Sequence, residues 1–510
     1  MATFGLQAEI PNIRLSREGG GPNEVSIAIN PADPLQMAVG SNPRYFYRSS
    51  DGGLSWIQSE LPRGSWGDPS VAFDSKGMLY YAHLANLPTG YFIDRLIVRR
   101  STDGGEHWVD SSEVGFNPPL RGQDKEYLAA DLTDSPHRDN IYMAWTQFDR
   151  YGSTHPGDSS RILFARSTDR GATWSEPIRV SDAAGDCRDD DETVEGAVPA
   201  VGPGGEIYLC WSGPAGILCD RSTDGGRSFG QDLSVVAQPG GWNFPVPGIF
   251  RCNGFPVTAV DVSSSPHRGT VYVAWSDQRN GPDNTDVFLA RSTDGAASWS
   301  LPRRVNTDTT VSHQFFPWMT VDRLTGTVSL VFYDRSRSAG NATEVTVAVS
   351  TDGGETFVSR CVSESPFLPD QSVFFGDYTG IAASGGRIVP VWTRMDDREL
   401  SVWVALLSED LLVSVPAAPS PPTAMVLDQN YPNPFNPVTT ITFEVSEYSS
   451  AVRLRIFDLL GRVVGTLVDG PLAPGRYPVT YQPTGLASGV YVYRLEGGGV
   501  VLQRAMLYAK

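Results

Sequence analysis

The feature of this chain that most constrains its fold is an eight-residue pattern that occurs six times. The copies begin at Ser49, Ser101, Ser167, Ser222, Ser292 and Ser350. Each reads Ser-x-Asp-x-Gly-x-x-Trp/Phe, except that the fifth copy has Ala296 in place of the glycine. The copies are 52, 66, 55, 70 and 58 residues apart, a period typical of propeller blades and similar arrays. We call this pattern the box repeat.

The residue types of the box repeat indicate a tight turn. Serine and aspartate side chains bond nearby backbone N–H groups, and glycine takes the positive φ that such turns need. The closing aromatic residue begins the next strand, so we expect it to pack between neighbouring units. The turn containing Ala296 is expected to be strained or differently shaped.

A second repeat, a strand, a turn and another strand, precedes each box repeat. Apolar and polar residues alternate in these pairs, as expected for half-buried strands. The pairs begin near Val25, Ser70, Ala129, Ala197, Thr258, Met319 and Tyr378. With the strands that enter and leave the box, each unit has four strands, and Leu400–Asp410 is a last strand without a box. We expect Pro11–Ser16 to complete the last blade and close the ring, which leaves no open sheet edge. Seven pairs predict an all-β, seven-bladed propeller, with six blades as the alternative.

Charge and cysteine usage limit the classes of partner. The net charge is −18; residues 424–510 hold seven basic and six acidic residues, so the rest of the chain carries −19. Such acidity argues against nucleic acid or an anionic membrane as the main partner. No apolar run approaches the roughly 18 residues of a membrane span. The first twenty residues lack the apolar core of a signal peptide, so the leader of an exported protein is expected outside this sequence.

The five cysteines are Cys187, Cys210, Cys219, Cys252 and Cys361, and none forms a CxxC pair. Cys210 and Cys219 flank a short hairpin, where they can face each other on adjacent strands. The pattern leaves a disulfide and two buried thiols as equal alternatives.

Two segments resemble known families. The box repeats are similar to the Asp boxes, or BNR repeats, of sialidase-type propellers, which implies such a propeller over residues 1–412. A Pro-rich segment, 413–423, reads as a linker. Residues 424–510 contain NPFNP, DLLGR and ASGVYVYRL and resemble a type IX secretion sorting domain, with about seven strands in a small Ig-like sandwich. That resemblance implies type IX machinery as a partner, and secretion or attachment at a Gram-negative outer membrane. An ordinary Ig-like binding module is the alternative.

The resemblance to sialidases implies that the chemistry lies in the central funnel. There, arginines bind the substrate carboxylate and a tyrosine activated by a carboxylate is the nucleophile. Tyr378, beside Asp377, is the candidate nucleophile, and the candidate catalytic carboxylates are Asp124, Glu126 and Glu195. The candidate substrate-binding residues are Arg251, Arg279, Arg335 and Arg394. The arginine motif FRIP of sialidases is absent near the start, so each of these residues can instead have a structural role.

These patterns support three hypotheses of function. The first is a sialidase-like glycoside hydrolase acting on extracellular glycans or glycoproteins. The second is a non-catalytic surface propeller that binds a glycan or protein, and the third is a purely structural surface protein, since the fold alone does not decide. No cofactor or catalytic metal is expected. The acidic loop Cys187–Glu195 is a candidate for a structural calcium ion, with a solvated loop as the alternative.

Overall fold

A computed structural model describes residues 10–87, 91–116, 121–410, 425–445, 449–472, 475–497 and 500–510. Every secondary-structure element bounded within these residues is a β-strand. The chain divides into two compact units, Met1–Val413 and Ser414–Lys510. The predicted linker 413–423 lies outside the described residues. In the described part, no helix is long and apolar enough to cross a membrane.

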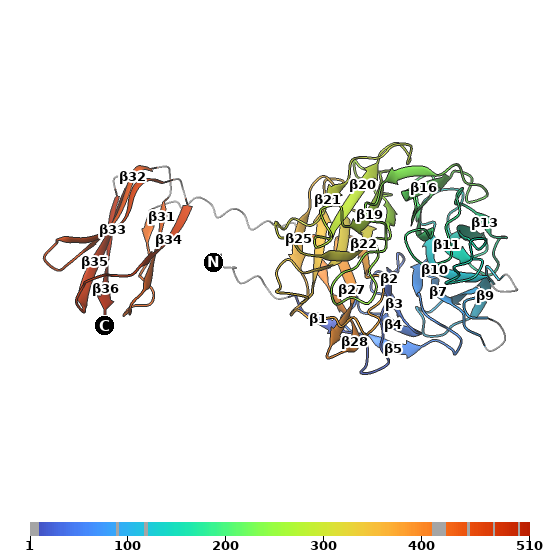
Figure 1. The fold of residues 1–510 in the computed structure, drawn as a ribbon, viewed down its shortest axis with the longest axis horizontal. Coiled ribbons are helices and arrows are strands. Elements are labelled where there is room, and N and C mark those ends of the chain that lie inside the picture. Colours follow the sequence, from blue (N-terminus) through green and yellow to red (C-terminus); the bar gives the residue numbers. More distant parts are fainter. Residues whose placement is uncertain are drawn as a thin grey trace. The chain divides into compact units, whose positions relative to one another are not determined.

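The first unit consists of antiparallel sheets, the blades, and all but the last are formed by four consecutive strands (Figure 1). Blade 1 contains β2 (Val25–Ile29), β3 (Met37–Ser41), β4 (Tyr45–Ser49) and β5 (Ile57–Glu60). Blade 2 contains β6 (Ser70–Phe73), β7 (Leu79–Leu84), β8 (Leu96–Ser101) and β9 (Asp110–Val114). Blade 3 contains β10 (Gly122–Ala130), β11 (Ile141–Phe148), β12 (Ser160–Ser167) and β13 (Ile178–Arg179).

The next three blades follow the same order. Blade 4 contains β14 (Glu195–Val201), β15 (Ile207–Gly213), β16 (Gly216–Ser222) and β17 (Leu233–Val236). Blade 5 contains β18 (Val257–Val260), β19 (Val271–Asp277), β20 (Asp286–Ser292) and β21 (Arg303–Arg304). Blade 6 contains β22 (Gln314–Val321), β23 (Val328–Asp334), β24 (Glu344–Ser350) and β25 (Val358–Cys361).

The last blade joins the two ends of the propeller sequence. It contains β26 (Gly380–Ser384), β27 (Arg387–Asp396), β28 (Glu399–Ala405) and, as its outer strand, β1 (Asn12–Arg14); β29 (Leu407–Ser408) also pairs with β27. Ile13 of β1 lies opposite Val404 of β28, and the two strands are side by side in Figure 1. The expectation that the N-terminal strand completes the last blade is therefore confirmed.

The first strand of every blade lies innermost. Each of these strands contacts the first strand of the next blade: β2 with β6, β6 with β10, β10 with β14, and so on through β18, β22 and β26 back to β2. The contacts form a closed ring, which is the arrangement of a β-propeller. The described residues of the first unit thus form seven sheets, one for each strand pair in the sequence.

The box repeats form the expected turns between the third and fourth strands. In the second copy, the Gly105 N–H donates to Ser101 Oγ (2.8 Å), and the Ser101 hydroxyl donates to Asp103 Oδ1 (2.8 Å). The His107 N–H also donates to that carboxylate oxygen (2.9 Å). In the fifth copy Ala296 takes the left-handed conformation (φ 68°) and keeps the equivalent bond. The turn therefore keeps its shape, and its alanine is strained.

The box aromatics pack against the preceding blade, as expected. Trp108 of blade 2 contacts Phe46 of blade 1 and Tyr81, with ring centroids 5.1 and 6.0 Å apart. Phe229 of blade 4 likewise contacts Phe164 of blade 3 (4.9 Å). Trp108 is only half-buried, so each box aromatic covers the edge of an interface between blades.

A contact between blades that the sequence analysis missed uses the arginine directly before the box serine. Its guanidinium donates to a carbonyl oxygen in the next box turn. The bonds are Arg100 to Arg170 O (2.9 Å), Arg166 to Gly225 O (2.9 Å), Arg221 to Gly295 O (2.6 Å) and Arg291 to Gly353 O (2.7 Å). The repeated Arg-Ser pair in the sequence is the signal for this contact.

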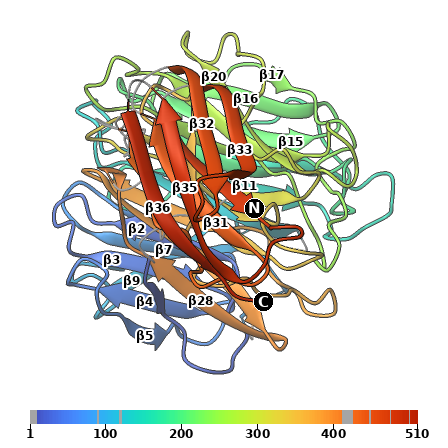
Figure 2. The ribbon, with the colours of Figure 1, turned by 90° about the vertical axis from the view of Figure 1, so that its left-hand side faces the viewer.

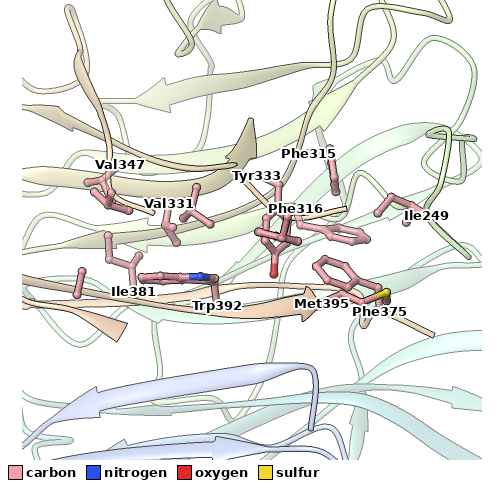
Figure 3. Close-up of a cluster of buried hydrophobic side chains, with 14 of the residues drawn as sticks. Ile249, Phe315, Phe316, Val331, Tyr333, Val347, Phe375, Ile381, Trp392 and Met395 are labelled. Carbon is pink, nitrogen blue, oxygen red and sulfur yellow. The ribbon is translucent and has the colours of Figure 1, made fainter. Parts of the chain in front are cut away.

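The hydrophobic core lies between the blades. Figure 3 shows part of it between blades 6 and 7, where Val331 of β23 lies near Trp392 of β27. The buried Tyr333 hydroxyl crosses this interface and donates to Thr393 O (2.8 Å). Since burial of large apolar side chains is the main favourable term in folding, each blade is stabilised chiefly by its neighbours.

The second unit is a sandwich of two sheets around one core. One sheet contains β30 (Val426–Leu427), β31 (Thr439–Val445) and β34 (Gly475–Tyr481). The other, seen in Figure 2, contains β33 (Val463–Leu472), β32 (Ser449–Phe457), β35 (Gly489–Gly497) and β36 (Val500–Tyr508). Phe435 of the NPFNP motif is buried in this core, with its ring 5.1 Å from that of Tyr508. The motif therefore places an aromatic ring in the core.

Candidate functional site

All seven inner strands begin at the same end of the central channel. At that point the backbone repeatedly takes a left-handed conformation, at Glu24 (φ 48°), Asp68 (φ 48°), Lys125 (φ 52°) and Phe316 (φ 51°). Such angles are uncommon for residues other than glycine, so their recurrence shows that several blades turn onto the axis in the same strained way. In β10 the turn is a bulge between Asp124 and Tyr127. We call this end of the propeller the funnel face.

A buried network of charges fills the funnel. The Lys125 ammonium lies 2.8 Å from Asp377 Oδ2, 3.5 Å from Asp68 Oδ2 and 3.6 Å from Glu24 Oε1. Arg251 pairs with Asp377 on one side and with Asp189 Oδ2 (2.6 Å) on the other. The two cations thus join four carboxylates, each from a different loop of the ring, and they close the axis at this end.

The pKa values of the buried carboxyl groups in the funnel are shifted in opposite directions, so some favour the ionised form and others the protonated form. Burial tends to raise the pKa of Asp377, but Arg251 and Lys125 hold it well below its usual range. Burial lowers the pKa of Lys125, but Asp377, Asp68 and Glu24 raise it well above its usual value. The Asp377–Lys125–Arg251 contacts are therefore ion pairs throughout the physiological pH range.

The three predicted catalytic carboxylates lie beside this network. Burial raises the pKa of Asp124, Glu126 and Glu195 well above the usual value, and carboxylates of the cluster raise it further. Both carboxyl oxygens of Glu126 and of Glu195 lack a hydrogen-bond partner among the described residues. A buried carboxyl group without a donor is far more stable protonated, so burial favours the neutral form of these two side chains.

Tyr378 is packed within the funnel. It is only 6% exposed, and its ring lies 5.9 Å from Tyr127 and 5.7 Å from Trp318. The Lys125 ammonium lies 5.7 Å from the ring centre. Burial raises the pKa of its hydroxyl well above the usual value, and Asp377 is bound to cations instead. This geometry matches a packing role, and the role of nucleophile stays a prediction that it does not favour.

The four predicted substrate-binding arginines are held at separate places. Arg251 alone joins the axial network. Arg279 pairs with Asp277 of its own hairpin, and Arg394 pairs with Asp396 (2.6 Å). Arg335 is buried and donates to Thr343 Oγ1 (3.0 Å) and Pro247 O (2.8 Å); burial lowers its pKa to about 10. Among the described residues, no two of the four share a partner, so the expected arginine cluster is not assembled.

The acidic loop Cys187–Glu195 uses its carboxylates within the protein. Besides its bond to Arg251, Asp189 accepts a hydrogen bond from the Tyr151 hydroxyl (2.8 Å). Asp191 accepts one from the Asn243 N–H (2.7 Å). Within the described ranges, no three His, Cys, Asp or Glu side chains gather in a way that could hold a metal ion. The calcium ion stays a prediction.

The exposed aromatic residues of the propeller all lie on the funnel face. Strands alternate in direction, so the loops before each first strand and after each second strand meet at this face. Every exposed Trp, Tyr or Phe among the described residues of the propeller lies in such a loop: Trp66, Tyr91, Phe92, Phe116, Tyr151 and Phe250. Exposed apolar residues of the opposite face, such as Leu54, Leu301 and Leu324, are aliphatic. The loop positions of these residues can be found in the sequence, but which of the rings stay exposed cannot, so this segregation was not predicted.

A groove of about 720 Å³ opens on the same face, lined by the loop that joins blades 4 and 5, the loop after β19 and Gln371. Phe250 and Arg251 line it together with the polar side chains of Asn243, Asp283 and Gln371. The Phe250 ring lies 6.0 Å from that of Phe374, and Arg251 lies 5.6 Å above the Phe374 ring. The groove thus combines aromatic surface with hydrogen-bonding groups beside the closed axis.

Comparisons with known proteins identify the second unit. Residues 429–507 match the family described as "Secretion system C-terminal sorting domain". The resemblance drawn from NPFNP, DLLGR and ASGVYVYRL is therefore confirmed, and the match marks the chain as a secreted or outer-membrane-attached protein. A search of curated proteins gives no match.

Several solved structures are similar to the propeller. NanB sialidase from Streptococcus pneumoniae is 8% identical, with a TM-score of 0.43, over 79% of this chain and 98% of its own. A sialidase from Trypanosoma rangeli is 11% identical, with a TM-score of 0.41, over 88% and 84%. An ulvan lyase, a polysaccharide lyase, is 12% identical, with a TM-score of 0.42, over 77% and 96%. These similarities are too weak to decide a function, which rests on the geometry of the site.

Proposed function

We propose that the chain is a secreted propeller that binds an extracellular glycan on its funnel face without acting as a sialidase. The observation that carries this proposal is the segregation of all exposed aromatic side chains of the described propeller onto that face. Exposed apolar surface gathered on one side of a protein is typical of a binding site. Aromatic rings with a polar edge nearby suit ligands that have both apolar and polar surfaces.

A glycan fits this surface better than other ligands. The C–H faces of sugar rings stack on aromatic side chains, and sugar hydroxyls need donors and acceptors such as those of Asn243, Asp283 and Gln371. The groove volume of about 720 Å³ falls in the usual range for ligand sites. The net charge of −18 disfavours nucleic acid. The secretion sorting domain supports exposure to extracellular polysaccharides.

The same geometry weighs against hydrolysis. A sialidase mechanism needs a nucleophile that reaches the sugar and arginines that converge on its carboxylate. Tyr378 is buried under Tyr127 and Trp318, and the carboxylate beside it is paired with Lys125 and Arg251. Glu126 and Glu195 are equally covered. Hydrolysis would require the axial network to open.

The test is a binding screen of the full chain on a panel of glycans, followed by calorimetry on those that bind. We expect Phe250→Ala or Trp66→Ala to weaken binding at least about tenfold, the loss of one stacked ring. Leu301→Ala, an exposed change on the opposite face, serves as the control.

A parallel assay on labelled glycosides tests the alternative. Hydrolysis of a glycoside that Tyr378→Phe abolishes, with the melting temperature retained, would favour the hydrolase over the binding protein. Equal binding by both aromatic variants and the parent would also contradict the proposal.

A further inference from the structure

A second cavity lies on the propeller axis at the end opposite the charged network. Its volume is about 300 Å³, and residues of all seven inner strands or of the turns that follow them line it. Its walls are apolar and include Ile27, Ala72, Leu128, Val201 and Ala383. These side chains keep partial exposure although they belong to the innermost strands, which shows that the cavity is open to solvent.

The charged network lies beyond the upper end of this cavity and contributes none of the described residues that line it. Lys125 precedes Leu128 by three residues on the same strand, and Asp377 precedes Ile381 by four. The contacting rings of Tyr127, Trp318 and Tyr378 come between the network and the cavity, so the mouth of the pocket lies at the face that carries the box turns.

One cation stands in this otherwise uncharged lining. Arg323, in the turn after β22, lines the pocket and is half-buried. Within the described part of the chain its guanidinium forms no hydrogen bond or ion pair, unlike the four arginines of the funnel face. An unpaired guanidinium beside apolar surface has its donors available for an anionic oxygen.

We propose that this axial pocket binds a small amphiphile, with its apolar chain between the inner strands and its carboxylate on Arg323. The pocket has the volume of about ten water molecules in the liquid, which matches a chain of about ten methylene groups. A medium-chain carboxylate therefore satisfies both the apolar walls and the free cation. This site is separate from the proposed glycan surface.

The experiment titrates the full chain with three probes that share a ten-carbon tail, below their micelle concentrations. They are decanoate, 1-decanol and decyltrimethylammonium. We expect decanoate to bind in a one-to-one ratio and about tenfold more tightly than decanol, and the cation to bind most weakly. Equal affinity for all three probes, binding of many molecules, or no binding of decanoate would overturn the proposal.

Two kinds of variant locate the binding. Arg323→Gln should lower the affinity for decanoate to that for decanol, whereas Arg227→Gln, an exposed arginine of another turn on the same face, should change neither. Ala72→Leu and Ala129→Leu, which narrow the pocket, should weaken the binding of both decanoate and decanol with little change in melting temperature. If these two variants do not fold, the Arg323→Gln result alone decides. An unchanged decanoate affinity in Arg323→Gln refutes the site.

Discussion

Replacing Lys125 by methionine tests whether the axial network holds the blades together. Methionine keeps the unbranched shape of the side chain and removes its charge. The ammonium lies within 3.6 Å of Asp377, Asp68 and Glu24, and all four side chains are nearly inaccessible to solvent. Breaking a buried ion pair from one side costs about 3–5 kcal/mol, because a charge stays buried without its partner.

The structure also sets how this cost depends on pH. A carboxylate that loses the ammonium can avoid its buried charge by taking a proton. For an ordinary pKa near 4, this costs about 4 kcal/mol at pH 7 and about 1.4 kcal/mol at pH 5. Loss of the cation removes one of the two charges that hold the folded-state pKa of Asp377 low, so that pKa rises and the destabilisation grows as the pH rises. We expect about 3–5 kcal/mol at pH 7 and less than half of that at pH 5.

Urea unfolding followed by tryptophan fluorescence measures this effect. All twelve tryptophans lie in the propeller sequence, so the signal reports the propeller and not the sorting domain. Lys76→Met is the control, because Lys76 is 65% exposed and contacts Asp139 only at 3.6 Å; its loss should cost at most about 1 kcal/mol. An unchanged midpoint for Lys125→Met, or the same loss at pH 5 and pH 8, would refute the reasoning.

Three further predictions follow from the burial and the contacts between blades. The folded-state pKa of Glu195 is raised, so its stabilising contribution is complete below its unfolded pKa and is lost as the pH rises through the folded pKa. Glu195→Gln should therefore have a higher melting temperature than the parent at pH 8 and the same one at pH 4. An equal difference in melting temperature at both pH values would contradict this. Trp108→Ala should lower the unfolding free energy by about 2–3 kcal/mol, less than for a fully buried ring because Trp108 is half-buried. Asp103→Ala should lower it by about 1–3 kcal/mol. Unchanged urea midpoints in both variants would disprove the structural role of the box repeat. Arg166→Gln should cost about 1–2 kcal/mol through its bond to Gly225 O, while Arg227→Gln leaves the midpoint unchanged.

Local patterns were sufficient for the repeating parts of the fold. The box turns depend on bonds between residues at most four positions apart, such as those of Ser101 and Asp103. The strand pairs depend on alternation within each strand, and even the closing strand β1 could be recognised as a copy of another outer strand. The paired register of Cys210 and Cys219 also follows from one hairpin, and their sulfur atoms lie 2.7 Å apart.

The candidate site depended on tertiary structure. Lys125 and Asp377 are 252 residues apart, and they meet only because the ring closes and the bulge of β10 lies at Lys125. The sequence predicted that Tyr378, Glu126, Glu195 and Arg251 lie in the funnel. It did not predict that they are buried, or that Asp377 pairs with cations and not with the tyrosine. Short-range hydrogen bonds and the alternation of apolar and polar residues depend only on residues that are close in the sequence. The sequence by itself therefore determined the repeats, the closing strand and the sorting domain. Which charges neutralise one another, which aromatic rings stay exposed and which cavity remains on the axis were decided by the packing of seven blades, because these contacts join residues that no local pattern relates.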